Sequence, residues 1–113
     1  MIDIEKLKKE IVKRLKPLKP EKIILFGSYA WGKVRKDSDI DIYVVTKDYF
    51  IPQNFKEKNK IYLKVANIMQ SFLRQYPTDL IVHTKEMHKK FLELNSSFCR
   101  EISNKGLILY ESK

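Results

Sequence analysis

The sequence contains a single cysteine, Cys99, so an internal disulfide is excluded. Its unbroken apolar runs are too short to span a bilayer, and its first ten residues, MIDIEKLKKE, contain no apolar signal core. It also lacks internal repeats, low-complexity tracts and any stretch typical of an interdomain linker. We therefore expect a cytoplasmic protein with no membrane association and with one domain over residues 1–113.

Positive charge is in excess: the chain has 23 Lys and Arg but 14 Asp and Glu, which gives a formal net charge of +9. A basic chain attracts polyanions such as nucleotides, nucleic acid or an acidic protein surface. The cations are spread along the chain, however, and no zinc-finger, KH or RRM signature is present. A basic nucleic-acid-binding domain is therefore an alternative interpretation, but not the favoured one.

Hydrophobic residues make up 43% of the chain, which is enough for one core and argues against wholesale disorder. Apolar periodicity and turn residues predict the order helix, strand, short helix, strand, long helix, strand, helix and short strand. We expect an α+β domain with two layers, in which helices cover one face of a mixed sheet. The predicted elements span residues 2–16, 22–26, 28–32, 38–45, 55–75, 79–82, 86–105 (with a break at 95–97) and 107–110.

Two acids mark the second predicted strand. Side chains alternate along a strand, so Asp39 and Asp41 point to the same side. Two carboxylates on one strand face repel each other unless a cation lies between them, and a divalent metal would serve. An Asp-x-Asp pair is often only solvated charge. Here apolar residues flank the pair and a glycine turn precedes it at a suitable distance, which favours the metal.

The preceding turn has the composition of an anion site. Gly27 permits a tight turn, and Ser28 would open a helix whose first N–H groups are free to bind phosphate. The alternative is that the two residues merely begin a helix. The basic run 33–36 that follows is either a phosphate contact or a solvated loop. Ser38, just before the acids, is expected to hydrogen-bond the neighbouring backbone and fix the entry to the strand.

The combined pattern, Gly27-Ser28-x-Ala30-x-Gly32 followed by Ser38-Asp39-x-Asp41, resembles the signature of the nucleotidyltransferase superfamily related to DNA polymerase beta. More narrowly it resembles the minimal nucleotidyltransferases (MNT proteins). The resemblance implies the two-layer, polymerase beta-like nucleotidyltransferase fold. The sequence departs from the pattern at Trp31, where many relatives carry Arg, and this affects one expected contact to the nucleotide.

The resemblance also implies a third carboxylate on a neighbouring strand. Asp79 is the acid in the right place, although the residues alone favour a turn aspartate between helix and strand. The implied reaction transfers a nucleoside monophosphate from an NTP, with ATP as the expected donor, to a hydroxyl, and it needs no protein nucleophile. The implied catalytic residues, which are also the ligands of two Mg²⁺ ions, are Asp39, Asp41 and Asp79. The implied nucleotide- and phosphate-binding residues are Gly27, Ser28, Ser38 and Lys33.

Partners follow from the same resemblance. MNT proteins are often paired with a helical HEPN ribonuclease toxin, and some are antitoxins that adenylylate a tyrosine on it. We therefore expect a HEPN-type partner that docks beside the Gly27 turn, where Lys33, Arg35 and Lys36 form the rim. The alternative within this family is a non-catalytic MNT-like antitoxin that only binds. The sequence leaves the acceptor, the preferred base and the presence of a homo-oligomer open.

Overall fold

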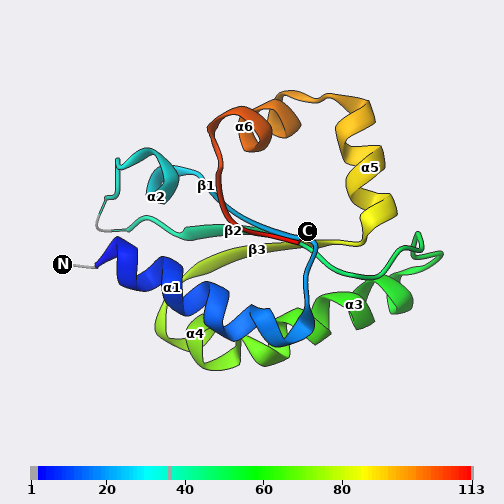
Figure 1. Ribbon diagram of the computed structural model, residues 1–113, viewed down its shortest axis with the longest axis horizontal. Coiled ribbons are helices and arrows are strands. Elements are labelled where there is room, and N and C mark those ends of the chain that lie inside the picture. The colour runs from blue at the N-terminus through cyan, green and yellow to red at the C-terminus, as the bar shows by residue number, and fades with distance from the viewer. Residues whose placement is uncertain (1–2, 36, 113) are drawn as a thin grey trace.

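A four-stranded mixed sheet forms the centre of the molecule (Figure 1). The computed structural model describes residues 3–35 and 37–112. The strand order is β3-β2-β1-β4; β1 runs antiparallel to both β2 and β4, and β2 runs parallel to β3. The strands are β1 (Lys22–Phe26), β2 (Ile40–Val45), β3 (Thr78–His83) and β4 (Leu107–Glu111).

Helices lie on both sides of this sheet. One face is covered by α1, α3 and α4, and the other by α5 and α6, while α2 follows β1 at one end of the sheet (Figure 1). In the described residues, no helix has the length and apolar character needed to cross a membrane. The helices are α1 (Ile4–Leu15), a 3₁₀ turn η1 (Lys16–Leu18), α2 (Ser28–Trp31), α3 (Phe55–Ile68), α4 (Gln70–Gln75), α5 (Lys85–Leu94) and α6 (Ser97–Lys105).

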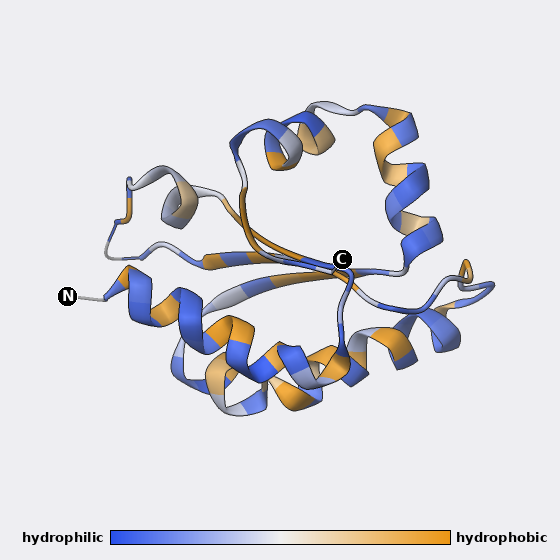
Figure 2. Cartoon of the chain, in the orientation of Figure 1, coloured by the Kyte–Doolittle hydropathy of each residue, from blue (hydrophilic) through white to orange (hydrophobic). Residues whose placement is uncertain are grey.

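The α+β class and the mixed sheet are confirmed, but the expectation that helices cover only one face is wrong. The central strands β1 and β2 are apolar along nearly their whole length instead of alternating, because both of their faces are buried (Figure 2). Residues such as Leu25 and Ile42 pack against α1 and α3. Their neighbours Phe26 and Tyr43 pack on the opposite face with Ile102 of α6.

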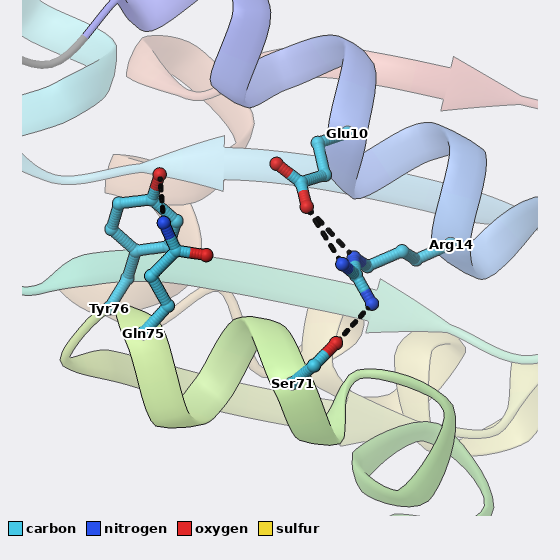
Figure 3. A network of polar contacts seen from close by, with 5 residues as sticks. All are labelled: Glu10, Arg14, Ser71, Gln75 and Tyr76. Atoms are coloured by element: carbon cyan, nitrogen blue, oxygen red, sulfur yellow. Dashed lines mark hydrogen bonds and ion pairs between the residues drawn. The ribbon is translucent and has the colours of Figure 1, made fainter.

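The first helix is fixed by its cap and by contacts with α4. Asp3 caps the helix by accepting a hydrogen bond from the N–H of Lys6 at 3.2 Å. Arg14 donates to Glu10 at 2.8 and 3.1 Å and also to the hydroxyl of Ser71 on α4 (Figure 3). These contacts hold α1 against the sheet, with its basic side exposed.

The predicted helix over residues 55–75 is two helices. The chain leaves the helical region at Met69, with φ −95° and ψ 6°, so α3 ends there and α4 begins in a new direction. Met69 and Phe72 are both completely buried. The break predicted at residues 95–97 is confirmed. Asn95 adopts a left-handed conformation with φ 46°, and Ser96 caps α6 by accepting from the N–H of Cys99.

Candidate active site

The strand register brings the three predicted acids to one end of the sheet. Asp41 on β2 lies between Phe26 of β1 and Asp79 of β3, directly opposite both. Directly opposed residues in neighbouring strands project to the same face of a sheet. Asp39 lies just before β2 and two residues from Asp41, so it shares this side. The carboxylates therefore gather on the face that carries α5 and α6.

Asp41 is the most perturbed of these acids. It is half-buried, whereas Asp39 and Asp79 are exposed. Burial, and then the charges of Asp79, Asp39 and Glu101, raise the pKa of Asp41 to about 6. A carboxylate crowded by other carboxylates in this way favours a proton or a cation beside it.

Glu101 is a fourth carboxylate that the sequence analysis did not single out. It lies half-buried on α6, one turn after Phe98, which packs edge-on against Phe26 with 5.6 Å between ring centroids. That packing brings Glu101 toward Asp41, whose pKa its charge helps to raise. The i,i+3 spacing of Phe98 and Glu101 is visible in the sequence, but the placement of α6 over this end of the sheet is not.

The raised pKa predicts that Asp41→Asn stabilises the protein at neutral pH. In the unfolded chain the pKa of Asp41 returns toward 3.8, so the folded state binds the proton more tightly. Stability linked to this proton is fully present below pH 3.8 and is lost as the pH rises through about 6. After allowance for the partial exposure of the carboxyl, Asp41→Asn should raise the free energy of unfolding at pH 7.5 by about 1–2 kcal/mol.

Urea titrations of the wild type and of Asp41→Asn from pH 3.5 to 8 measure this gain in the free energy of unfolding. The gain should shrink steadily as the pH falls. Asp48→Asn is the matched control, since Asp48 lies beyond the other end of β2 and pairs with Lys64 at 3.7 Å. A gain for Asp41→Asn that stays constant across the whole pH range would contradict the electrostatic explanation.

Gly27 connects β1 to α2 in a conformation that only glycine adopts readily, with φ 72° and ψ −157°. A Cβ atom at this position would lie 2.1 Å from Oδ2 of Asp41. The tight turn predicted at Gly27 therefore has a positive φ. The carboxylate of Asp41 occupies the space that a side chain at residue 27 would need. The position of this carboxylate therefore depends on glycine at residue 27.

The other predicted nucleotide contacts lie around this turn. Ser28 is the first residue of α2 and is half-buried, while the N–H groups of Ala30 and Trp31 donate to the carbonyl of Gly27. The first N–H groups of a helix have no acceptor within the helix, so they are available to an anion. Lys33 is exposed and its N–H donates to the carbonyl of Ser28 at 3.0 Å.

Ser38 closes the loop before the acids. Its hydroxyl accepts from the N–H of Arg35 at 2.8 Å, and its own N–H donates to the carbonyl of Arg35 at 3.0 Å. The predicted hydrogen bond to the neighbouring backbone is confirmed, and a role toward phosphate stays a prediction. Lys36, which we also placed on the rim, lies outside the described residues.

Trp31 ends α2 and contacts α6. Its ring is 42% exposed, and Nζ of Lys105 lies 5.4 Å from the ring centroid. Residue 31 is the position at which the sequence departs from the pattern that it resembles. The cation at this position is therefore the ammonium group of Lys105 on α6, which lies over the ring of Trp31. In many relatives it would be the Arg at residue 31 itself.

Two histidines lie behind the acids on the same sheet face. Nδ1 of His83 and Nδ1 of His88 each lie 2.8 Å from the hydroxyl of Tyr43, which follows Asp41 by two residues. Burial, then His88 and Lys58, lower the pKa of His83 to about 4, so its ring is neutral at pH 7. Both rings are half-buried, and each lies within hydrogen-bond distance of Tyr43.

The donor set suits a magnesium ion. Among residues 3–35 and 37–112, no three His, Cys, Asp or Glu side chains are arranged so that they could hold a metal ion as they stand. Asp39, Asp41 and Asp79 nevertheless supply hard carboxylate oxygens from neighbouring positions, which is the chemistry that Mg²⁺ prefers. Burial, and then repulsion by the neighbouring carboxylates, raise the pKa of Asp41, and a cation would relieve the repulsion. The residues therefore fit the predicted ion.

Comparison with known proteins defines the class. The family model described as "Polymerase beta, Nucleotidyltransferase" matches residues 5–113. The chain therefore belongs to the polymerase beta-like nucleotidyltransferase family, and it is a nucleotidyltransferase. The resemblance inferred from the Gly-Ser turn and the Ser-Asp-x-Asp motif is confirmed.

Two relatives from Methanocaldococcus jannaschii have nearly the same length. The chain is 36% identical over 112 residues to "Putative protein adenylyltransferase MJ0604", with 94% of this chain and 97% of the relative covered. It is 34% identical over 104 residues to "Putative protein adenylyltransferase MJ0141", with 92% of each covered. A solved structure described as a toxin-antitoxin with AMP-PNP shares 26% identity at a TM-score of 0.60, over 94% of this chain and 74% of that chain.

Proposed function

We propose that this protein transfers AMP from ATP to a hydroxyl group on a partner protein and releases pyrophosphate, with two Mg²⁺ ions held by Asp39, Asp41 and Asp79. The observation that carries the proposal is the register of the parallel pair β2–β3. It sets Asp79 directly opposite Asp41, and Asp41 in turn lies against the Gly27 turn. Carboxylates and a phosphate-binding turn are thereby adjacent, as a phosphoryl-type transfer requires.

Each residue has a role in this reaction. The N–H groups at the start of α2 and the hydroxyl of Ser28 bind the triphosphate. Asp39 and Asp41 would hold a magnesium ion, and Asp41 would have to lose its proton to do so. Asp79, exposed at the outer strand, lies where an acceptor can approach and accepts the proton of its hydroxyl. Bound magnesium neutralises the charge that develops on the phosphates and lowers the pKa of the acceptor hydroxyl.

The donor and the acceptor are supported by the comparisons. Both archaeal relatives carry names of protein adenylyltransferases, and the toxin-antitoxin structure is described with AMP-PNP, an ATP analogue. This chain spans 97% and 92% of those relatives. Their names support an acceptor on another protein, and the family resemblance points to a HEPN-type toxin.

The exposed cations Lys33 and Arg35 lie on the loop between the turn and the acids. They are suited to steer an acidic surface of the partner toward the site. Association should then slow as the salt concentration rises.

Co-expression with the neighbouring gene product tests the function. Intact-mass spectrometry of that partner should show one or more added AMP groups when the wild-type chain is present, and none with Asp41→Asn. If the partner binds but never gains AMP, the chain is a non-catalytic antitoxin. If radioactive ATP labels a structured RNA or a small alcohol instead, the protein-acceptor part of the proposal is wrong while nucleotide transfer stands.

Ser28→Ala should weaken binding of Mg-ATP by about 1–3 kcal/mol, because the lost hydroxyl would otherwise donate to a charged phosphate oxygen. Isothermal titration calorimetry measures the change. Ser97→Ala is the matched control, since Ser97 is also the first residue of a helix but belongs to α6. Equal affinities of wild type and Ser28→Ala would place the triphosphate elsewhere.

A further inference from the structure

A second concave surface lies away from the acids, between α1 and the edge strand β4. It is a groove of about 670 Å³, and neither the nucleotide site nor the carboxylates contribute to it. Its residues are Lys8, Lys9, Val12, Lys13, Lys16, Leu107, Ile108 and Leu109. The floor is thus aliphatic, and one rim consists of lysines.

The strand that forms this groove has one unpaired edge. β4 is the last strand of the sheet and pairs only with β1, so the backbone groups on its outer edge are not part of the described sheet. Leu107 and Ile108 are 36% and 55% exposed there. The β-bulge lies opposite Ile23 and Ile24, which leaves Leu107 and Ile108 in regular pairing with β1.

The lysines of the rim lie on α1. Lys8 forms an ion pair with Glu5 at 3.0 Å. Lys9, Lys13 and Lys16 form no ion pair within the part of the chain that the structure describes. Their charges are therefore not compensated locally, and they line one side of an apolar edge.

We propose that this groove binds an extended, acidic segment of another protein, which adds to the sheet as a fifth strand beside β4. The outer edge of β4 supplies backbone hydrogen bonds. Because successive residues of a strand point to opposite faces, the acidic side chains of the segment lie on the α1 face and its apolar side chains lie on the other face, beside Ile108. Its acidic side chains face Lys9, Lys13 and Lys16. The groove thus selects an alternating acidic and apolar strand.

Two other occupants fit less well. A second copy of this chain paired edge to edge would bring two sets of groove lysines together, and that repulsion opposes a symmetric dimer. Single-stranded nucleic acid is held mainly by aromatic stacking and phosphate contacts. The described lining offers the lysines but no aromatic side chain.

The groove begins at the active-site end of the sheet, because Leu107 pairs with Leu25, two residues before Gly27. A fifth strand would lie three strand spacings from β2, about 14 Å. About five extended residues beyond the paired segment cover that distance. The idea that the bound segment delivers an acceptor to the acids rests on the proposed function. Docking of the segment beside β4 does not, and it is measured by binding alone.

The test uses a fluorescent peptide of about ten residues that alternates Glu and Val, titrated with the full chain and followed by anisotropy. Lys9→Glu with Lys13→Glu should weaken binding by about tenfold or more. Lys89→Glu with Lys90→Glu, the same charge change on the exposed side of α5, should change it less than about twofold. Hydrogen exchange of the β4 amides should slow when the peptide is bound.

Three further probes complete the test, and thermal melting confirms that each variant is folded. A peptide of equal charge with prolines in place of alternate valines should not bind, since it cannot pair as a strand. Tighter binding of oligouridine than of the peptide would overturn the proposal, as would concentration-dependent dimerisation through β4. Equal loss of peptide affinity in both double variants would also overturn it. None of these readouts depends on ATP, so failure of nucleotide transfer leaves this test intact.

Discussion

Asp41→Asn should lower the rate of AMP transfer by about a thousandfold while the protein remains folded. The substitution removes a ligand charge at the centre of the acid group, between Asp39 and Asp79, and loss of a metal costs several kcal/mol of transition-state stabilisation. At about 1.4 kcal/mol per tenfold in rate, three orders of magnitude follow. Asp39→Asn should behave similarly. The measurement is single-turnover transfer from labelled ATP at saturating nucleotide and magnesium.

Measuring the stability of Asp41→Asn together with its activity distinguishes loss of a metal ligand from damage to the fold. Most substitutions that abolish activity by damaging a fold lower stability, whereas Asp41→Asn is expected to raise it at neutral pH. Asp48→Asn should leave transfer unchanged, because Asp48 lies beyond the opposite end of β2. Wild-type turnover in either Asp39→Asn or Asp41→Asn would remove the metal assignment.

Gly27→Ala should have the second-largest effect, and it should act on stability and activity together. The backbone conformation at residue 27 costs a non-glycine residue about 1–3 kcal/mol. In addition, the new Cβ would collide with Oδ2 of Asp41, which lies 2.1 Å from that position. Displacing the carboxylate by even about 1 Å should reduce transfer on the order of a hundredfold. Urea unfolding and single-turnover kinetics measure the two losses.

A double-mutant cycle separates strain from collision. In an Asp41→Ala background the carboxylate is gone, so Gly27→Ala should cost only the backbone strain. Gly32→Ala is the matched control: Gly32 also has a positive φ, 74°, but a Cβ there would meet no atom within 4 Å. Its cost should be limited to strain at the end of α2, with transfer little affected. Equal costs of Gly27→Ala in both backgrounds would show that the collision is not significant.

Much of the fold was accessible from the sequence because local patterns and tertiary structure agree. The apolar stripe of α1, the β-branched strands and the break near Asn95 were all visible. The second helical layer was not predicted, although Ile23 to Phe26 contain a continuous apolar run that indicates burial on both faces. The end of α3 at Met69 was also missed, since no proline or glycine marks it and only burial in the core requires it.

The site was predictable as a set of residues but not as an arrangement. Gly27, Ser28, Asp39 and Asp41 are close in sequence and carry a recognisable spacing. Asp79 needed the family resemblance, because only the parallel register of β3 shows that it faces Asp41. Glu101 and Lys105 were missed because they reach the site through the packing of α6, which depends on contacts such as Phe26 with Phe98.

The parallel pairing of β2 with β3 also determines when the site can form during folding. β1 and β2 are antiparallel neighbours in the chain and close a short loop, which is a fast process. Asp79 reaches Asp41 only after α3 and α4 have formed the crossover between β2 and β3. Loop closure of that length is slow relative to hairpin formation. A nascent chain released before β3 is synthesised would contain the glycine turn and two acids, yet it would have no third carboxylate and no catalytic competence.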